Sequence, residues 1–345
     1  MIIHGLRWLK RVLPRYPKRD VLILSFARRT LHEGAYWDIY IDPILSDLEL
    51  HHLIIERPYH GHDQPVPNRP IKYLDGIYLL RAFMGHIGIW STRSVRRLIH
   101  RYLAFVVDQV DPSVIFLSGT HPFRVLIDVA NERSIPSIYF QQGRGLIPPE
   151  PDYVLTTGAY FTETVTHTEN KVITTGNPFV ERFANIPEQP GLICVIEGNQ
   201  RTSRVFGLAE ALCAEHPDSE VVYVPHPQRR WTGRYDTGTN LTVFREADVY
   251  DLIARAEVVI GEVSTLLYEA AFLGADVFVW SSEHPLAQYF PQFDDCAELQ
   301  AMMQNDQPSV PTVEFIRPGG LERQRSAIAK IFKWEGIDNI LRKDP

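Results

Sequence analysis

Cysteine is scarce in this sequence, and its scarcity excludes two kinds of protein. The 345 residues include three cysteines, Cys194, Cys213 and Cys296, and no two of them lie close together. A disulfide scaffold or a cysteine zinc site needs more cysteines at shorter spacing, so we expect free thiols in a reducing compartment. Long apolar runs are also lacking. No stretch reaches the roughly 20 residues of a membrane-spanning helix, and the N-terminus lacks the uninterrupted apolar core of a secretory signal.

Positive charge is not in excess either. The formal net charge is -7, and the composition, with 45% hydrophobic and 22% charged residues, is ordinary for a globular protein. A nucleic-acid-binding domain is usually basic, so we do not expect nucleic acid as a partner. The length corresponds to about two domains.

The first 19 residues, MIIHGLRWLKRVLPRYPKR, differ from the rest because they hold six Lys or Arg and no acid. Trp8 is the kind of ring that sits at membrane interfaces, and Pro14 ends any helix formed here. The apolar residues at helical spacing are Ile2, Leu6, Leu9 and Leu13. The segment fits either a basic amphipathic helix on an anionic membrane or a surface helix packed on the first domain.

Strands and helices alternate from residue 20 to about 186. Each predicted strand is a short, apolar, β-rich stretch, and a long helix with a basic side is predicted over 90–110. The strands span 20–26, 51–58, 113–119, 137–143, 153–158 and 171–178. The stretch between the first two looks like a loop that opens into a helix. This alternation predicts an α/β domain with a parallel sheet.

A second series of strands and helices begins after the Pro-containing linker at 185–191 and fills residues 190–320. Its strands are predicted at 192–199, 220–228, 241–246, 257–263 and 276–280. Residues 321–345 follow as a pair of C-terminal helices. We therefore predict two doubly wound, Rossmann-like domains that face a cleft, with boundaries at 20–186 and 190–320.

Glycines and polar residues gather at the carboxyl ends of these strands, where doubly wound domains bind their ligands. Folding alone does not require this clustering, so it predicts a binding site. The residues concerned include Gly119, Gln142, Gly143, Gly158, Gly176, Asn177, Glu197, Gly198, His226, Pro227, Glu262, Ser264 and Thr265.

The stretch VVIGEVSTLLYEAAFLG, residues 258–274, shows the pattern most clearly. A buried strand ends in Gly261 and Glu262, and Ser264 and Thr265 then open a helix. One hydroxyl would be explained as an N-cap, which accepts a bond from a first-turn N–H group. Two hydroxyls at a helix N-terminus also suit a phosphate, because the free N–H groups and the helix dipole attract anions. Both interpretations are open at this point.

A resemblance to a known group of enzymes favours the phosphate. VPHPQ, followed about 35 residues later by IGEVSTLLYEAAFLG, resembles the His-Pro and Ser-Ser/Thr motifs of bacterial GT-B transferases. These include sialyltransferases, capsule Kdo transferases and teichoic-acid glycerophosphotransferases. PDYVLTTGAYF and KVITTGNPFVERF resemble their domain-end segment. IYFQQG resembles their strand ending in Gln-His-Gly, with Gln142 replacing the histidine. The likeness covers about residues 135–285.

The resemblance implies a nucleotide-sugar donor bound by the second domain and an acceptor bound by the first. His226 would donate a bond or proton to the leaving phosphate, Pro227 would fix the backbone beside it, and Ser264 and Thr265 would hold the same phosphate. Glu269 would accept bonds from the ribose. The other implied donor-binding residues are Gln142, Gly143, Gly176, Asn177, Glu197, Gly198 and Glu262. No metal and no cofactor is expected, because the sequence has no DxD triplet.

The catalytic base is not fixed by the sequence. The loop after the first strand is rich in acids and aromatics and offers Glu33 and Asp38, with His32 and Asp42 beside them. His121, which follows the third strand, is a rival. An inverting route needs such a base, whereas a retaining route would use a carboxylate as nucleophile.

Three functions remain open from the sequence. The first is a metal-independent glycosyltransferase with a nucleotide-sugar donor, a CMP-sugar being favoured, and a cell-surface glycan or lipid-linked acceptor. It would work in the cytoplasm, at the membrane face if residues 1–19 bind anionic lipid. The second is an isomerase resembling UDP-sugar 2-epimerases. The third is a non-catalytic partner that holds a nucleotide sugar or glycan for a membrane enzyme.

Overall fold

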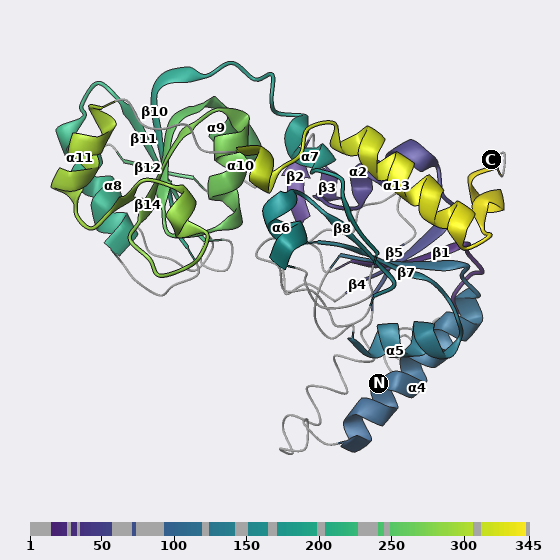
Figure 1. Cartoon of the computed structure of the whole chain (residues 1–345). Helices are drawn as coiled ribbons and strands as arrows, with labels where there is room; N and C mark the ends of the chain where they lie inside the picture. The colour runs from purple at the N-terminus through teal and green to yellow at the C-terminus, as the bar shows by residue number, and fades with distance from the viewer. Residues whose placement is uncertain are drawn as a thin grey trace.

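The structure is a computed structural model of the whole chain. It describes residues 15–25, 29–32, 35–56, 71–73, 93–118, 124–141, 151–164, 171–198, 204–226, 241–244, 249–305 and 312–342. These residues form two α/β units, which lie side by side in Figure 1. The predicted fold class, two doubly wound Rossmann-like domains, is confirmed.

The first domain is built on a parallel seven-stranded sheet in the order β5-β4-β1-β6-β7-β8-β9. Its interior strand β1 (Val21–Ser25) is buried along its whole length, as expected for an apolar strand covered on both faces. The other strands are β4 (His52–Glu56), β5 (Ile71–Tyr73), β6 (Val114–Leu117), β7 (Ser137–Phe140), β8 (Tyr153–Thr156) and β9 (Lys171–Thr174). The sequence did not predict β5.

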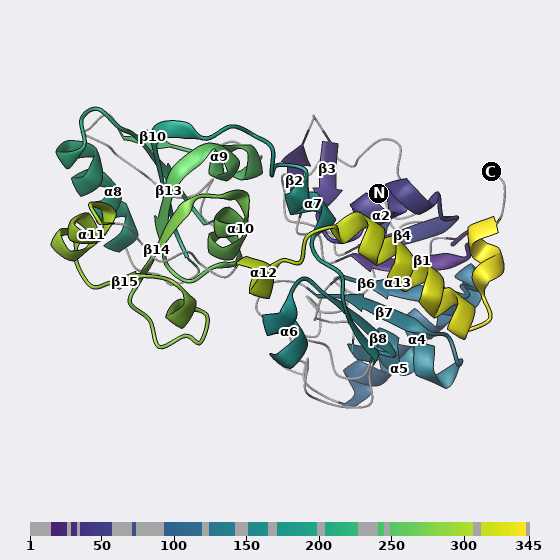
Figure 2. The same ribbon diagram turned by 45° about the horizontal axis from the view of Figure 1, so that its top comes forward.

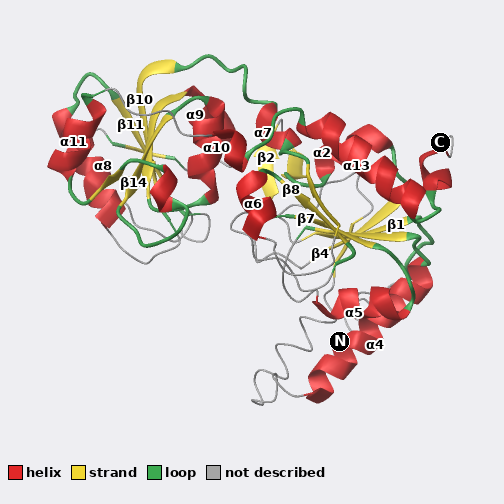
Figure 3. Cartoon of the chain, in the orientation of Figure 1, coloured by secondary structure: helices red, strands yellow, loops and turns green. Residues whose placement is uncertain are grey.

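Helices cover both faces of this sheet. In Figures 1 and 3, α13 (Gly320–Trp334) and α2 (Asp42–Leu48) lie above the sheet, and α4 (Arg93–Val110) and α5 (Arg124–Glu132) lie below it. The apolar side chains of the strands alternate between the two layers, so that Ile23 and Phe116 face one layer and Leu22 and Leu117 the other. The short helices α6 (Ala159–Thr164) and α7 (Pro178–Glu181) follow β8 and β9.

An antiparallel hairpin, β2 (Arg29–His32) and β3 (Ala35–Asp38), lies between β1 and α2. Figure 2 shows it standing beside α7, next to the sheet. The sequence indicated a loop here, because neither short strand, RTLH or AYWD, is a continuous apolar run.

The second domain has a parallel six-stranded sheet in the order β12-β11-β10-β13-β14-β15. Its strands are β10 (Gln189–Ile196), β11 (Glu220–Val224), β12 (Thr242–Val243), β13 (Ala256–Gly261), β14 (Asp276–Trp280) and β15 (Gln292–Phe293). Its helices are α8 (Arg204–Glu215), α9 (Val249–Arg255), α10 (Thr265–Leu273), α11 (Cys296–Met303), the 3-10 turn η1 (Ala287–Tyr289) and α12 (Thr312–Phe315). Helices α8 and α11 cover one face, and α9 and α10 cover the face turned toward the first domain (Figure 1).

The chain passes between the domains twice. It enters the second domain between α7 and β10 and returns before α13, whose Phe332 lies 6.3 Å from Phe116 between ring centroids. The last predicted helix is the 3-10 segment η2 (Asp338–Arg342). Residues 321–342 are therefore part of the helical layer over the first sheet.

Aromatic rings join the two domains where the crossing segments meet. Tyr268 of α10 lies 5.4 Å from Phe161 of α6, and Tyr250 of α9 lies 5.1 Å from Phe179 of α7, between ring centroids. No helix among the described residues is long and apolar enough to cross a membrane.

Candidate functional site

Three neighbouring strands of the second sheet bring the predicted donor-binding residues together. In the order β11-β10-β13, Ile196 is paired with Val224 on one side and Gly261 on the other. Because the strands are parallel, the residues that follow them meet at one edge of the sheet. Glu197 and Gly198, then His226, and then Glu262 to Thr265 occupy this carboxyl edge.

Glu197 holds the end of β11. Its side chain is 5% exposed, and its Oε2 accepts the backbone N–H of His226 at 2.7 Å. The carboxylate therefore fixes where the half-buried His226 leaves the strand, through the backbone rather than through the imidazole. We predicted Glu197 as a donor-binding residue. Its observed contact is with the protein, so it acts here by positioning His226.

Two glycines allow the ends of β10 and β13 to approach closely. A Cβ atom on Gly198 would lie 2.4 Å from Oε2 of Glu262, and one on Gly261 would lie 2.4 Å from the carbonyl oxygen of Ile196. Either contact is far shorter than atoms tolerate. The side chain of Glu262 consequently lies over Gly198, and the two acids Glu197 and Glu262 belong to the same small region.

Ser264 occupies the N-cap position of α10, with extended backbone angles (φ -145°, ψ 166°). Its hydroxyl does not cap the helix, although an N-cap serine usually does so. The Oγ atom is buried and has no hydrogen-bond partner among the residues that the structure describes. Thr265 follows in the first turn and is 9% exposed. The capping interpretation of Ser264 is therefore wrong, and its buried hydroxyl lies at the N-terminus of α10 without bonding the helix.

Glu269 does not lie where we expected. Its side chain is fully buried, and Oε2 accepts a bond from the hydroxyl of Tyr250 at 3.1 Å. A carboxylate without exposed surface cannot reach a ribose at the sheet edge unless the helix moves. The observed contact joins α10 to α9, so the geometry does not support the predicted ribose contact.

Gly176 and Asn177 have structural roles at the crossing between the domains. Gly176 has φ +97°, and a Cβ atom there would lie 2.1 Å from the carbonyl oxygen of Arg317. Asn177 is 2% exposed and caps α7, with Oδ1 accepting N–H groups of Phe179 (3.2 Å) and Val180 (3.4 Å). We expected both residues to bind the donor, but these contacts assign them to the chain crossing.

Asp38 is buried and hydrogen-bonded, so it is not placed to act as a catalytic base. It is 4% exposed, and its Oδ2 accepts hydroxyl bonds from Ser25 (2.5 Å) and Ser118 (2.7 Å). Its Oδ1 accepts the N–H of Tyr40 at 3.1 Å, and its own N–H donates to Asp42. An acceptor hydroxyl has no access to this carboxylate. Asp38 joins the hairpin β2–β3 to the ends of β1 and β6, which contradicts its predicted role.

Several predicted residues lie outside the described part of the chain. They are Glu33, His121, Gln142, Gly143 and Pro227, together with residues 1–14 of the basic N-terminal segment. The side chain of His32 is likewise not described. Their predicted roles stay predictions. In the described ranges, no three His, Cys, Asp or Glu side chains are placed to hold a metal ion.

The sequence did not single out Ser25, Ser118 or Tyr250, which bind the two buried carboxylates. Ser25 is the last residue of β1 and Ser118 follows β6, and this shared position at a carboxyl strand end was the available signal. The tyrosine gave none, because α9 is an ordinary amphipathic helix in the sequence.

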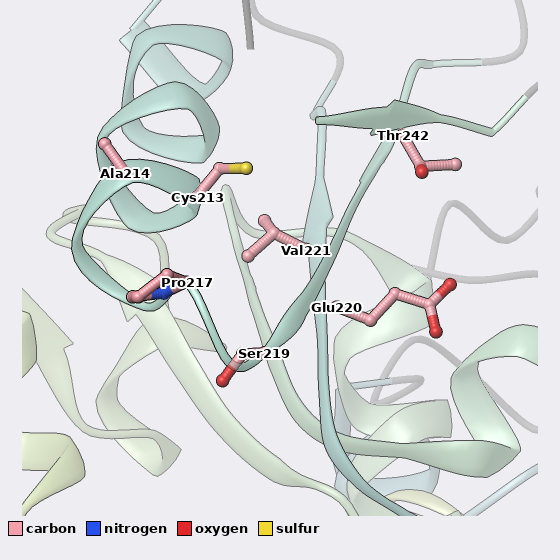
Figure 4. Close-up of a pocket in the computed structure, with 7 residues that line it drawn as sticks. All are labelled: Cys213, Ala214, Pro217, Ser219, Glu220, Val221 and Thr242. Atoms are coloured by element: carbon pink, nitrogen blue, oxygen red, sulfur yellow. The ribbon is translucent and has the colours of Figure 1, made fainter. Parts of the chain in front are cut away.

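A pocket of about 270 Å³ lies at the opposite end of the second sheet. Figure 4 shows its lining, in which Cys213 and Pro217 come from the end of α8 and its following turn, and Glu220 and Val221 from the start of β11. Oε2 of Glu220 accepts a bond from Gln189 at 2.8 Å. This pocket lies at amino-terminal strand ends, away from His226 and Ser264, so it does not belong to the candidate site.

The architecture is similar to that of solved GT-B enzymes. A UDP-GlcNAc 2-epimerase from Methanocaldococcus jannaschii, in complex with UDP-GlcNAc and UDP, is 15% identical over 91% of this chain and 99% of its own, with a TM-score of 0.58. The epimerase from Rickettsia bellii is 12% identical over 94% and 99%, with a TM-score of 0.61. A variant of the wall teichoic acid polymerase TagF is 12% identical over 96% of both chains, with a TM-score of 0.58.

At these identities the likeness establishes the GT-B fold alone. No family model matches the sequence, and no curated protein is similar to it. The structures similar to this chain include both epimerases and a polymerase, so the fold does not choose between them.

Proposed function

We propose that this protein is a metal-independent glycosyltransferase that moves a sugar from a nucleotide-activated donor to a cell-surface glycan or lipid-linked acceptor. The observation that carries the proposal is the buried Ser264 hydroxyl, which lies at the N-terminus of α10 without a partner among the described residues. A buried polar atom left unbonded costs stability, so such an atom suggests a ligand that completes it.

A phosphate is the ligand that this position suits. The first-turn N–H groups of α10 and the positive end of its dipole attract an anion, and the hydroxyls of Ser264 and Thr265 add donors. His226 lies at the neighbouring strand end, held through its backbone by Glu197. An imidazole there can donate to a phosphate oxygen as negative charge develops on the leaving group.

The two acids at this edge favour a donor with fewer charged phosphates. Glu197 and Glu262 repel a phosphate, and the repulsion grows with the number of charged phosphates held at this edge. A CMP-sugar carries one charged phosphate, whereas a UDP- or GDP-sugar carries two. The acids therefore support the CMP-sugar that the sequence favoured. UDP-sugars are the competing donors, because a structure with the same fold binds UDP-GlcNAc and UDP.

Isomerisation is the second candidate, and the likeness to UDP-GlcNAc 2-epimerases over nearly the whole chain favours it. A 2-epimerase must break the C2–H bond of the sugar, while a transferase leaves it intact. Incubation in heavy water with UDP-GlcNAc, and in parallel with a CMP-sugar, separates the two. Deuterium at C2 of UDP-GlcNAc supports the epimerase, and acceptor-dependent release of nucleotide from either donor with unlabelled sugar supports the transferase. Both donors unchanged would indicate a binding partner without catalysis.

Nucleotide binding at Ser264 is tested by thermal shift with CMP, CDP, UDP and GDP, because a ligand that binds the native state raises its stability. Ser264→Ala combined with Thr265→Ala should weaken binding by about 1–3 kcal/mol, the cost of losing hydrogen bonds to a charged group. Ser219→Ala, in the pocket at the far end of the sheet, is the control and should bind as the wild type does. If the double variant binds nucleotide as tightly as the wild type does, the phosphate does not bind at Ser264 and Thr265.

The chemical nature of the acceptor determines where in the cell the proposed enzyme would act. A lipid-linked acceptor would place it at the cytoplasmic membrane face, and the basic residues between Arg7 and Arg19 would attract anionic lipid. Within that segment, Lys18 lies 2.8 Å from Asp111, so this lysine forms an ion pair with the first domain.

A further inference from the structure

Helix α4 presents an outward face that differs from the other described surfaces. Three large apolar side chains are strongly exposed in the described part of the chain, and two of them, Leu98 (45%) and Phe105 (39%), lie on α4. The third, Trp334, is stacked on Tyr153. Leu98 and Phe105 have no such ring partner among the described residues. They lie seven residues apart, two helical turns, and so share one face.

Two arginines accompany these side chains on the same face. Arg97 and Arg101 are exposed and form no ion pair with any residue that the structure describes. At 100° per residue, Arg97, Arg101, Phe105 and Leu98 all fall within about a third of the helix circumference. We call these four residues the α4 face. The buried side of the helix, which includes Leu103 and Val106, packs on the sheet.

The other Arg, His and Asp side chains described on α4 are paired with α5 or with the residue that follows it. Arg96 lies 2.8 Å from Asp128, and His100 lies 2.9 Å from Glu132. Arg133 pairs with Asp108 at 2.7 Å, and this hydrogen bond lowers the pKa of Asp108. The acids that lie closest in sequence to the α4 face are therefore engaged, and the charge left on it is that of two arginines.

The sequence around the helix has the same bias. No Asp or Glu occurs between Asp75 and Asp108, while five arginines do, in a chain whose net charge is -7. A local excess of positive charge in an acidic protein is selective for a negative partner. Figures 1 and 2 show α4 along the outer edge of the first domain, on the side of the sheet away from α13.

We propose that the α4 face docks the protein onto an anionic lipid surface, with Arg97 and Arg101 at the headgroups and Leu98 and Phe105 inserted beside them. A helix face is convex and gives a peptide no groove, whereas a bilayer accepts exposed apolar side chains between basic ones. Two arginines and two apolar side chains give weak, reversible binding that salt screens. The inference depends only on this surface, and it would bring a transferase to a lipid-linked acceptor.

Co-sedimentation with vesicles tests the proposal on the full chain. Wild type should bind vesicles that mix phosphatidylglycerol with phosphatidylcholine, be released at high salt and ignore phosphatidylcholine alone. Arg97→Gln with Arg101→Gln should lower the partition coefficient about 30-fold, the equivalent of about 1 kcal/mol for each arginine near the surface. Leu98→Ser with Phe105→Ser should also lower the partition coefficient, without any change in the charge of the protein. All four positions are exposed, so these variants should fold normally, which circular dichroism checks.

Matched variants separate this surface from other sources of binding. Arg204→Gln with Lys333→Gln removes two exposed charges elsewhere and should bind like the wild type. Arg7→Gln with Lys10→Gln and Arg11→Gln measures the N-terminal segment in the same full chain. Unchanged binding of the Arg97/Arg101 variant, or equal binding to neutral vesicles, would overturn the proposal. So would a dimer that the α4 variants dissociate, because the face would then be an interface between two copies. The assay uses no nucleotide or acceptor, so its failure leaves the proposed transferase activity untouched.

Discussion

Asp38→Ala should destabilise the first domain strongly, because one buried carboxylate satisfies several buried donors. Ser25 and Ser118 are 2% and 0% exposed, and both donate to Oδ2 of Asp38 at 2.5 and 2.7 Å. Tyr40 donates its N–H to Oδ1. Alanine removes all three bonds at once. It also frees the hairpin β2–β3 from the ends of β1 and β6.

The magnitude follows from the number of charged hydrogen bonds. Each bond to an ionised group contributes about 1.5–3 kcal/mol, and a stranded buried donor adds its desolvation cost. Two hydroxyl bonds lost together should cost about 3–5 kcal/mol, a large share of the roughly 5–15 kcal/mol that stabilises a typical domain. Ser118→Ala removes one bond and should cost about 1–2 kcal/mol, and Asp38→Asn, which keeps a carbonyl acceptor, should fall between the two.

Amide hydrogen exchange in β1 and β6 is the appropriate assay, since a two-domain protein need not unfold in one step. Asp251→Ala is the control. It breaks an exposed ion pair with Arg255 and should cost less than about 1 kcal/mol. A loss below 1 kcal/mol for Asp38→Ala would refute the anchoring role. A stable but inactive Asp38→Ala protein would restore the prediction that Asp38 is the catalytic base.

Two further predictions concern single side chains. His226→Ala should lower the turnover more than the donor affinity, because the imidazole acts as charge builds on the leaving phosphate. The backbone bond to Glu197 survives the change. If steady-state kinetics show an effect on affinity alone, His226 is a binding residue. Glu181 accepts the N–H of Gly320 at 2.8 Å, and burial raises its pKa above the ordinary 4.5. Its stabilising contribution is therefore fully present below the unfolded pKa and is lost as the pH rises through the folded pKa. Thermal unfolding should show the advantage of wild type over Glu181→Gln shrinking from acid to neutral pH, and a constant difference would contradict the assignment.

Much of the architecture follows from local sequence. Buried parallel strands such as β1 and β13 read as short apolar runs, and glycines with polar residues mark where they end. The hairpin β2–β3 escaped this reasoning because its strands, RTLH and AYWD, contain polar residues and are not continuous apolar runs. The partners of Asp38 escaped it for another reason. Ser118 lies 80 residues away in the chain, and only the pairing of β1 with β6 brings it near.

Two of the corrected residues carried signals that would have placed them. Asn177 precedes a proline, and an asparagine N-cap with proline at the first helical position is a common helix start. Glu269 sits in a helix that is apolar on nearly all sides, and such a helix is buried. A glutamate there is therefore enclosed. Ser264 is different, since only the three-dimensional structure reveals that its hydroxyl leaves the helix uncapped.

The equivalent positions at the strand ends of the two sheets are occupied differently, and this difference supports the proposed nucleotide site in the second domain. In each sheet the strand order reverses beside the first strand, between β1 and β6 and between β10 and β13. Ligands of doubly wound domains bind beyond the strand ends at this reversal. In the first domain the position is filled by the carboxylate of Asp38, bound to a serine from each strand end. In the second, Gly198 leaves room for Glu262, and the nearby Ser264 hydroxyl is buried without a partner among the described residues. Acids are present at both positions, so the distinguishing feature of the second is the unused hydroxyl of Ser264 at a helix N-terminus, which suits a phosphate.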